Sequence, residues 1–180
     1  MKTLLKILKY FFLVWGILTF LLAAWAGVSL FNAFTGKNVL KINHVSRHDV
    51  RFVLNGCGLG EKRLIKVVHI YESARSFTGD HFDAYAILIS HVEENELTPD
   101  QYWARGDRAS PVLTDAVKLV ASWARNETKD WFPNENELLS ENYYIYARRI
   151  SMHSGNMVHI AEIAFVNPVT KMVYYASVKV

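Results

Sequence analysis

Residues 143–180 have the sequence YYIYARRISMHSGNMVHIAEIAFVNPVTKMVYYASVKV, and this stretch decides the fold. Three runs rich in β-branched and aromatic residues are separated by two turn signals, a pattern typical of an antiparallel meander. Strands are predicted at 143–152, 157–166 and 172–180. Side chains of the last strand alternate between two faces, and one of these faces is predicted to be core.

The residues before the meander predict the other half of a sheet. Three further strands are expected at 49–54, 64–74 and 82–90, because these runs are rich in β-branched and aromatic residues. The turn residues at 76–80, which include Gly79, predict a hairpin between the second and third of them.

Two helices are predicted between the two sets of strands. Thr98-Pro99-Asp100-Gln101 is a helix-start signal, and this helix is expected to end by Gly106. Ser110-Pro111 is a second start, and it is followed by apolar residues at helical spacing: Leu113, Ala116, Val117, Val120 and Ala124. The predicted order is β-β-β-α-α-β-β-β, an α+β domain with two helices packed on a largely antiparallel sheet.

The N-terminus predicts a membrane anchor. Tyr10 to Phe34 is a run of 25 residues without a charged side chain, preceded by Lys2, Lys6 and Lys9. As a helix it would extend roughly 37 Å, enough to cross the lipid bilayer. The lysine cluster favours a cytoplasmic N-terminus. We therefore expect residues 1–36 to be a tail and a single-pass helix in the inner membrane, and residues 37–180 to be one extracytoplasmic, periplasmic domain.

Two alternatives concern the same segment. Ala24-Trp25-Ala26 has the small-x-small form of a signal peptidase site, and cleavage after Ala26 would release a soluble protein. If the segment is retained, Ala23 and Gly27 provide a small surface on which another transmembrane helix could pack.

Charge and cysteine content exclude some classes of protein. The chain has 20 Lys and Arg residues and 17 Asp and Glu residues. Three of the basic residues and none of the acidic ones precede residue 37, so the outer domain has 17 of each. A domain that binds nucleic acid usually has a basic excess, so nucleic acid is not predicted as a partner. The single cysteine, Cys57, excludes an intramolecular disulfide.

The candidate catalytic residues lie around one predicted turn. Asp80 or Asp83 could orient His81 as a general base, and Arg75 could hold an anion. The simpler interpretation is a hairpin turn, because Gly, Asp, Ser and Thr are favoured in turns for conformational reasons alone.

Other motifs are weaker. Gly56-Cys57-Gly58-Leu59-Gly60 lacks the third glycine of a dinucleotide loop, because Glu61 stands at that position. His44 and His48 are a close pair without a third ligand. No metal or cofactor is predicted.

The sequence favours a binding protein over an enzyme. A membrane tether and many tyrosines and tryptophans predict contact with another protein, as in an accessory subunit of an envelope complex or an immunity protein that neutralises a toxin. The alternative is a membrane-bound hydrolase with its site near Arg75 and Asp83.

Overall fold

The computed structural model describes residues 12, 15–27, 50–98, 102–128, 130–153 and 157–180. The chain divides into two units, Met1–Val39 and Leu40–Val180, which are described separately. In the first unit, residues 15–27 are helical. Within the described ranges, no helix is both long enough and apolar enough to cross a membrane. The predicted span at 10–34 extends into residues outside those ranges, and it stays a prediction.

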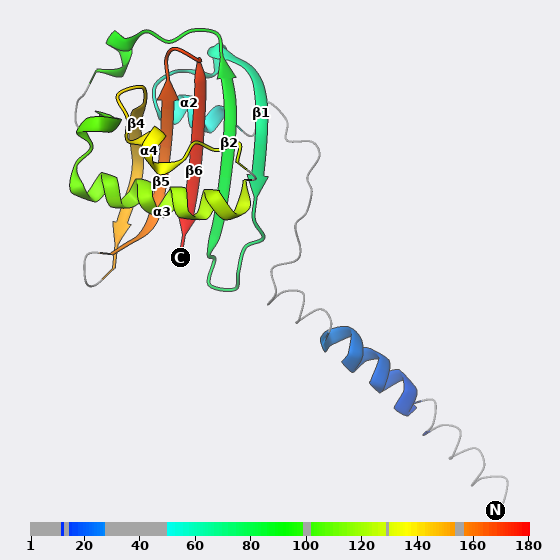
Figure 1. Ribbon diagram of the computed structural model, residues 1–180. Coiled ribbons are helices and arrows are strands. Elements are labelled where there is room, and N and C mark those ends of the chain that lie inside the picture. Colours follow the sequence, from blue (N-terminus) through cyan, green and yellow to red (C-terminus); the bar gives the residue numbers. More distant parts are fainter. Residues whose placement is uncertain (1–11, 13–14, 28–49, 99–101, 129, 154–156) are drawn as a thin grey trace, which may run out of the picture. The chain divides into compact units, whose positions relative to one another are not determined.

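The described part of the second unit contains one antiparallel sheet of six strands in the order β1-β2-β6-β5-β4-β3 (Figure 1). The strands are β1 (Leu64–Glu72), β2 (His81–Ile89), β3 (Trp103–Arg105), β4 (Tyr144–Met152), β5 (Val158–Asn167) and β6 (Met172–Lys179). β1 pairs with β2, and β5 pairs with both β4 and β6. The predicted hairpin and the predicted meander are therefore confirmed.

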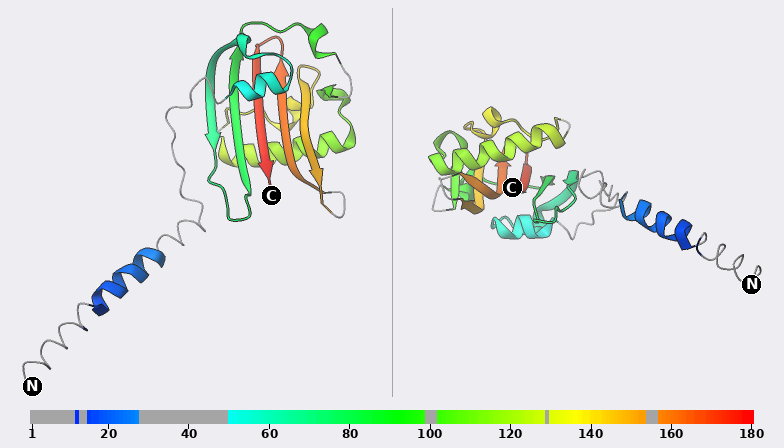
Figure 2. Two further views of the ribbon diagram at one scale, coloured as in Figure 1. Left: turned by 180° about the vertical axis from the view of Figure 1, so that it is seen from behind. Right: turned by 90° about the horizontal axis from the view of Figure 1, so that it is seen from below.

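Helices cover both faces of this sheet. α3 (Pro111–Glu127) and α4 (Glu135–Leu138) lie on one face, and α2 (Arg51–Gly56) lies on the other. Figure 2 shows this most clearly in the view from below, where the sheet lies between α3 and α2. Short 3₁₀ turns occupy Glu61–Arg63, Glu94–Leu97 and Gly106–Arg108. The α+β prediction is confirmed.

Two clusters of buried side chains lie on the two faces. The cluster beneath α3 includes the predicted helix stripe, with Val120 and the strand residue Phe165 both fully buried. The cluster beneath α2 includes Leu54 and Tyr175. Because neighbouring residues of a strand point to opposite faces, β6 contributes Ala176 to the first cluster and Tyr175 to the second. Both faces of the last strand are thus core, where the sequence predicted one.

The strand predicted at 49–54 is wrong, because Arg51–Gly56 form α2 and Val50 is its N-cap. Its buried residues are Val50, Val53 and Leu54, at 0%, 3% and 0% exposure. Their spacing of three and four residues is helical, and Phe52 between them stays 41% exposed. Apolar periodicity therefore outweighed the β-propensity of the individual residues.

The helix predicted from Thr98 to Gly106 is also wrong. Thr98 follows a 3₁₀ turn, residues 99–101 lie outside the described ranges, and the next residues form β3. Trp103 is 8% exposed and its ring centroid lies 5.2 Å from that of Tyr146. The start signal was not followed by an apolar stripe that a helix could bury, so strand pairing and burial of Trp103 prevailed.

The predicted start of α3 is confirmed, and it positions the site described below. Ser110 Oγ accepts a hydrogen bond from the backbone N–H of Leu113 at 3.3 Å, and Pro111 is the first helical residue. One 3₁₀ turn separates this cap from β3, and the N–H of Gly106 in that turn donates to the carbonyl of Tyr143 at 2.8 Å. The edge strand and the first turn of α3 are therefore neighbours.

Candidate functional site

The polar turn singled out in the sequence forms a network at one end of β1, β2 and β6. Arg75 donates two hydrogen bonds to Asp83, from Nη1 to Oδ1 at 2.7 Å and from Nη2 to Oδ2 at 2.6 Å. The side chain of Asp83 is 8% exposed and that of Arg75 is 53% exposed. These bonds raise the pKa of the Arg75 guanidinium. Both carboxylate oxygens of Asp83 are bound to Arg75, the residue predicted to hold an anion.

His81 contacts a hydroxyl and a carbonyl. Its Nδ1 lies 2.8 Å from the carbonyl oxygen of Gly79, and its Nε2 lies 3.1 Å from Ser177 Oγ. The carboxylate of Asp80 accepts a hydrogen bond from the hydroxyl of Thr78, within the turn. The structure thus brings Arg75 to Asp83 and His81 to Ser177, and each of the two predicted aspartates is bound to a group other than His81.

The network continues across the sheet. Glu72, Asp83, Ser177 and Glu162 are paired in register on β1, β2, β6 and β5. Tyr85 donates its hydroxyl hydrogen to Glu72 at 2.6 Å, and burial raises the pKa of this phenol. Each member of this row is bound to a residue outside it: Glu72 to Tyr85, Asp83 to Arg75, Ser177 to His81, and Glu162 to Arg148 and Arg149. Such pairing satisfies polar groups at the margin of a core.

The glycine-rich loop is a connection between α2 and β1. Gly58 and Gly60 both have a φ of 79°, a conformation that glycine adopts without strain. A short 3₁₀ turn, Glu61–Arg63, and then the predicted strand β1 follow them, so the α-helix that a dinucleotide loop requires does not begin here. Cys57 Sγ lies 3.6 Å from the carbonyl oxygen of Leu54, and burial raises the thiol pKa to about 11. The thiol is therefore protonated at neutral pH and is a poor nucleophile.

The two small residues predicted to pack against another transmembrane helix, Ala23 and Gly27, both belong to the helical residues 15–27. A Cβ built on Gly27 would meet no described atom within 4 Å. His44 and His48 lie outside the described ranges. Within those ranges, no group of three or more His, Cys, Asp or Glu residues is placed to hold a metal ion.

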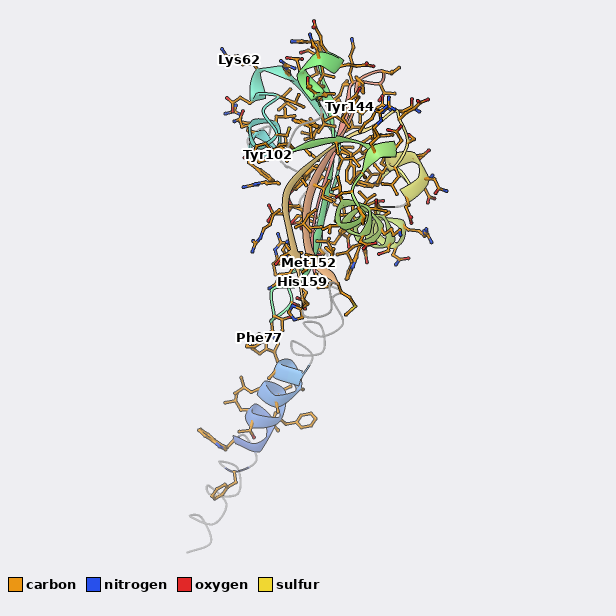
Figure 3. The ribbon with its side chains drawn as sticks, turned by 90° about the vertical axis from the view of Figure 1, so that its left-hand side faces the viewer. Lys62, Phe77, Tyr102, Tyr144, Met152 and His159 are labelled. Carbon is orange, nitrogen blue, oxygen red and sulfur yellow. The ribbon has the colours of Figure 1, made fainter. Side chains whose placement is uncertain are left out.

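A pocket of about 600 Å³, here called the edge pocket, opens where β3 ends beside β4. Figure 3 shows this edge of the sheet, with Tyr102 at a level between Tyr144 and Met152. Three segments line the edge pocket: Tyr102, Trp103, Ala104 and Arg105 in and before β3; Arg108, Ser110, Val112 and Leu113 at the start of α3; and Ala147 and Ile150 in β4.

The edge pocket combines an apolar wall with cationic side chains. Val112 is 41% exposed although it is aliphatic. Arg105 is held by Asp107, with two hydrogen bonds of 2.6 Å that raise the pKa of Arg105 and lower that of Asp107. Arg108 is exposed and forms no hydrogen bond or ion pair with any described residue. Among the described residues, therefore, the guanidinium of Arg108 has no partner that prevents it from binding an anion of another molecule.

The sheet edge beside the pocket is unsuited to simple strand addition. β3 pairs only with residues 144–146 of β4, and the N–H of Ala147 donates to the carbonyl of Tyr102 at 3.4 Å. A bulge follows between Ala147 and Arg149, and Arg148 and Arg149 are consecutive in the sequence at this point of β4. Bulges and charged residues discourage pairing with a further strand. Recognition at this edge must therefore depend on side chains.

Comparison with protein-family models, with curated proteins and with solved structures found no match. Function is therefore inferred from the residues and their geometry.

The polar network and the edge pocket differ in whether their polar groups are already bound within the domain. In the network Arg75 is bound to Asp83 and the hydroxyl of Thr78 to Asp80, whereas the edge pocket has open volume, apolar surface and, among the described residues, a cation without an ion-pair partner. The edge pocket is the better candidate for a binding site.

Sequence reasoning missed the edge pocket because its walls are far apart in the chain. Residues 102–113 and 147–150 meet only after β3 pairs with β4, and no motif within either segment indicates that pairing. The only local signals are Val112, which lies off the buried helix stripe, and Arg108 just before the helix cap. Both are also ordinary surface features.

Proposed function

We propose that this chain is a membrane-tethered interaction protein, and that its outer domain binds an acidic and apolar segment of a partner protein in the edge pocket. The observation that carries this proposal is Arg108, which has no ion-pair partner in the described part of the chain, beside an apolar wall that includes Val112 and Leu113. A partner that places a large apolar side chain against the wall and a carboxylate on Arg108 would satisfy both features.

Magnitudes indicate a weak contact. A volume of about 600 Å³ lies within the range of ordinary ligand pockets. Burial of one large apolar side chain contributes about 1.5–3 kcal/mol, and one charge-assisted hydrogen bond contributes about 1.5–3 kcal/mol. The entropy lost on association offsets much of this sum. Useful occupancy then needs a high local concentration, which two partners in one membrane provide.

The proposed tether rests on the N-terminal sequence. The uncharged run at 10–34 and the lysines before it support a single span with the N-terminus in the cytoplasm and the domain outside. In this arrangement the domain acts in the periplasm as an accessory subunit of an envelope complex or as an immunity protein. Either role requires a protein partner. Cleavage after Ala26 would give the same domain in soluble form.

The geometry favours binding over the hydrolase alternative. A hydrolase at the polar turn needs a nucleophile, a base and an oriented acid that are open to substrate. Ser177 and His81 are 3.1 Å apart, but Ser177 is only 8% exposed. Both oxygens of Asp83 are bound to Arg75. The polar turn therefore supports a structural role better than a catalytic one.

Val112→Glu is expected to weaken binding at least about tenfold while the fold stays intact. The new carboxylate would pair with Arg108 and repel an acidic partner, and a glutamate in the first turn is favourable to the helix dipole. The matched control is Val169→Glu, because Val169 is an 80% exposed valine in the turn between β5 and β6. Both variants should unfold at the temperature of the parent, to within a few degrees.

The binding measurement uses full-length protein in nanodiscs and a display library of short random peptides. Peptides enriched on the parent should combine acidic and large apolar residues. They should bind Val169→Glu equally well and Val112→Glu at least about tenfold more weakly, a loss of about 1.4 kcal/mol. Peptides that bind all three proteins equally, or no enrichment over empty nanodiscs, would count against the edge pocket as the site.

A further inference from the structure

The hairpin end between β4 and β5 gathers the residue types that soft metal ions prefer. The sequence from Met152 to His159 has the form M-H-x-x-x-M-x-H and holds two of the four methionines and two of the seven histidines of the chain. We propose that this end of the sheet is a copper(I) site, in which His153 and His159 bind through their imidazoles and Met152 or Met157 adds a thioether.

The two imidazoles are already side by side. The ring centroids of His153 and His159 are 4.5 Å apart, with 56° between the ring planes. Metal–imidazole bonds are about 2.0–2.1 Å long, so one ion can lie between two nitrogens of adjacent rings after a small rotation. His153 is exposed, which leaves its ring free to make that rotation.

One nitrogen of this pair has no hydrogen-bond partner among the described residues. Nδ1 of His159 is buried from solvent and neither donates nor accepts a hydrogen bond with any of them, and within the described ranges it is the single such side-chain atom. A buried polar atom without a partner destabilises a fold, so its presence needs an explanation. A metal ion bound at Nδ1 would explain it, because the lone pair of the neutral imidazole would then bond to the metal.

Both methionines belong to the same end of the β4–β5 hairpin as this pair. The backbone N–H of His153 donates to the carbonyl of Met157 at 2.9 Å, which places Met157 across the hairpin from His153. Met152 is opposite Val158, the neighbour of His159, and Figure 3 shows Met152 and His159 at the same end of the sheet. Met152 is 47% exposed and Met157 is 69% exposed. Both side chains are thus accessible to an incoming ion.

The donor set selects the metal. A structural zinc site uses four ligands from Cys, His and carboxylates, and the described residues offer no group of three such side chains. Two imidazoles and a thioether form a softer set with fewer ligands, which suits copper(I). This inference is independent of the edge pocket, whose cation Arg108 takes no part in it.

The test is an anaerobic titration of full-length protein in detergent with copper(I), in competition with the chromophoric chelator bicinchoninate. The parent should remove one equivalent of copper from the chelator. His153→Gln should lower the affinity by at least about tenfold, because loss of a residue that only hydrogen-bonds to a metal ligand already costs that much at many metal sites. His91→Gln, which changes an exposed histidine elsewhere, should bind copper like the parent.

A second measurement tests the thioether without risk to the fold. The double variant Met152→Leu and Met157→Leu keeps the size and apolarity of both side chains, and copper X-ray absorption should show a sulfur ligand in the parent that is lost in this variant. The proposal is overturned if the parent leaves all copper with the chelator, if His91→Gln weakens binding as much as His153→Gln, or if zinc(II) binds as tightly as copper(I).

Discussion

Gly106→Ala should destabilise the outer domain by about 3 kcal/mol or more, since overpacking against rigid backbone is among the costlier single changes. An alanine Cβ at this position would lie 2.4 Å from the carbonyl oxygen of Leu138 and 2.5 Å from that of Ser140. Both neighbours are backbone atoms, so no side chain can rotate away. The residue lies between β3 and α3, so relief of the clash must also displace a wall of the edge pocket.

Urea unfolding of the full-length protein in mild detergent, followed by circular dichroism, measures the loss. Gly56→Ala is the matched control, because its Cβ would meet only Arg148 Cδ at 3.9 Å and Gly56 is the last residue of helix α2. Alanine in a helix is favoured over glycine by up to about 1 kcal/mol, so this control should be neutral or slightly more stable. If Gly106→Ala changed the free energy of unfolding as little as Gly56→Ala, the close packing of Gly106 against Leu138 and Ser140 would be contradicted.

Phe165→Ala should destabilise the domain by about 3–5 kcal/mol, the range for loss of a fully buried aromatic side chain. Phe165 is 0% exposed in the central strand β5, and its ring packs edge-on against Phe132 at a centroid distance of 6.0 Å. The cost combines lost burial with the cavity left between the sheet and the segment that follows α3.

Phe77→Ala is the control for that substitution, because Phe77 lies in the β1–β2 turn and is fully exposed (Figure 3). Its loss should change the free energy of unfolding by less than about 0.5 kcal/mol. If Phe165→Ala and Phe77→Ala unfolded at the same urea concentration, the claim that Phe165 belongs to the core beneath α3 would be contradicted.

The meander and α3 were predictable because each is specified by local pattern. Strand alternation after residue 143 and the Ser110-Pro111 start followed by Leu113 are signals within one segment. Thr98 misled because a four-residue start signal carries less weight than the burial of Trp103, which depends on residues far away in the chain. At 49–54 the count of β-branched residues misled, although the spacing of Val50, Val53 and Leu54 is that of a helix.

The candidate site was less predictable than the fold. The acid and base suggested by Asp83 and His81 lie on one strand, but their hydrogen bonds go to Arg75 and Ser177, and only the paired structure decides this. The edge pocket needs three segments to meet. The imidazole pair at His153 and His159 is local in sequence, yet the bulge that brings the two rings together is a property of the folded hairpin.

Photocrosslinking in native membranes tests the central claim most directly. The full-length protein would carry benzoylphenylalanine at Val112 or, as the control, at Val169. We predict a covalent adduct with another protein from position 112 and none from position 169, and loss of the adduct when Arg108→Glu is introduced into the same chain. Equal adducts from both positions, or an adduct at 112 that Arg108→Glu leaves unchanged, would contradict binding of an acidic partner segment in the edge pocket.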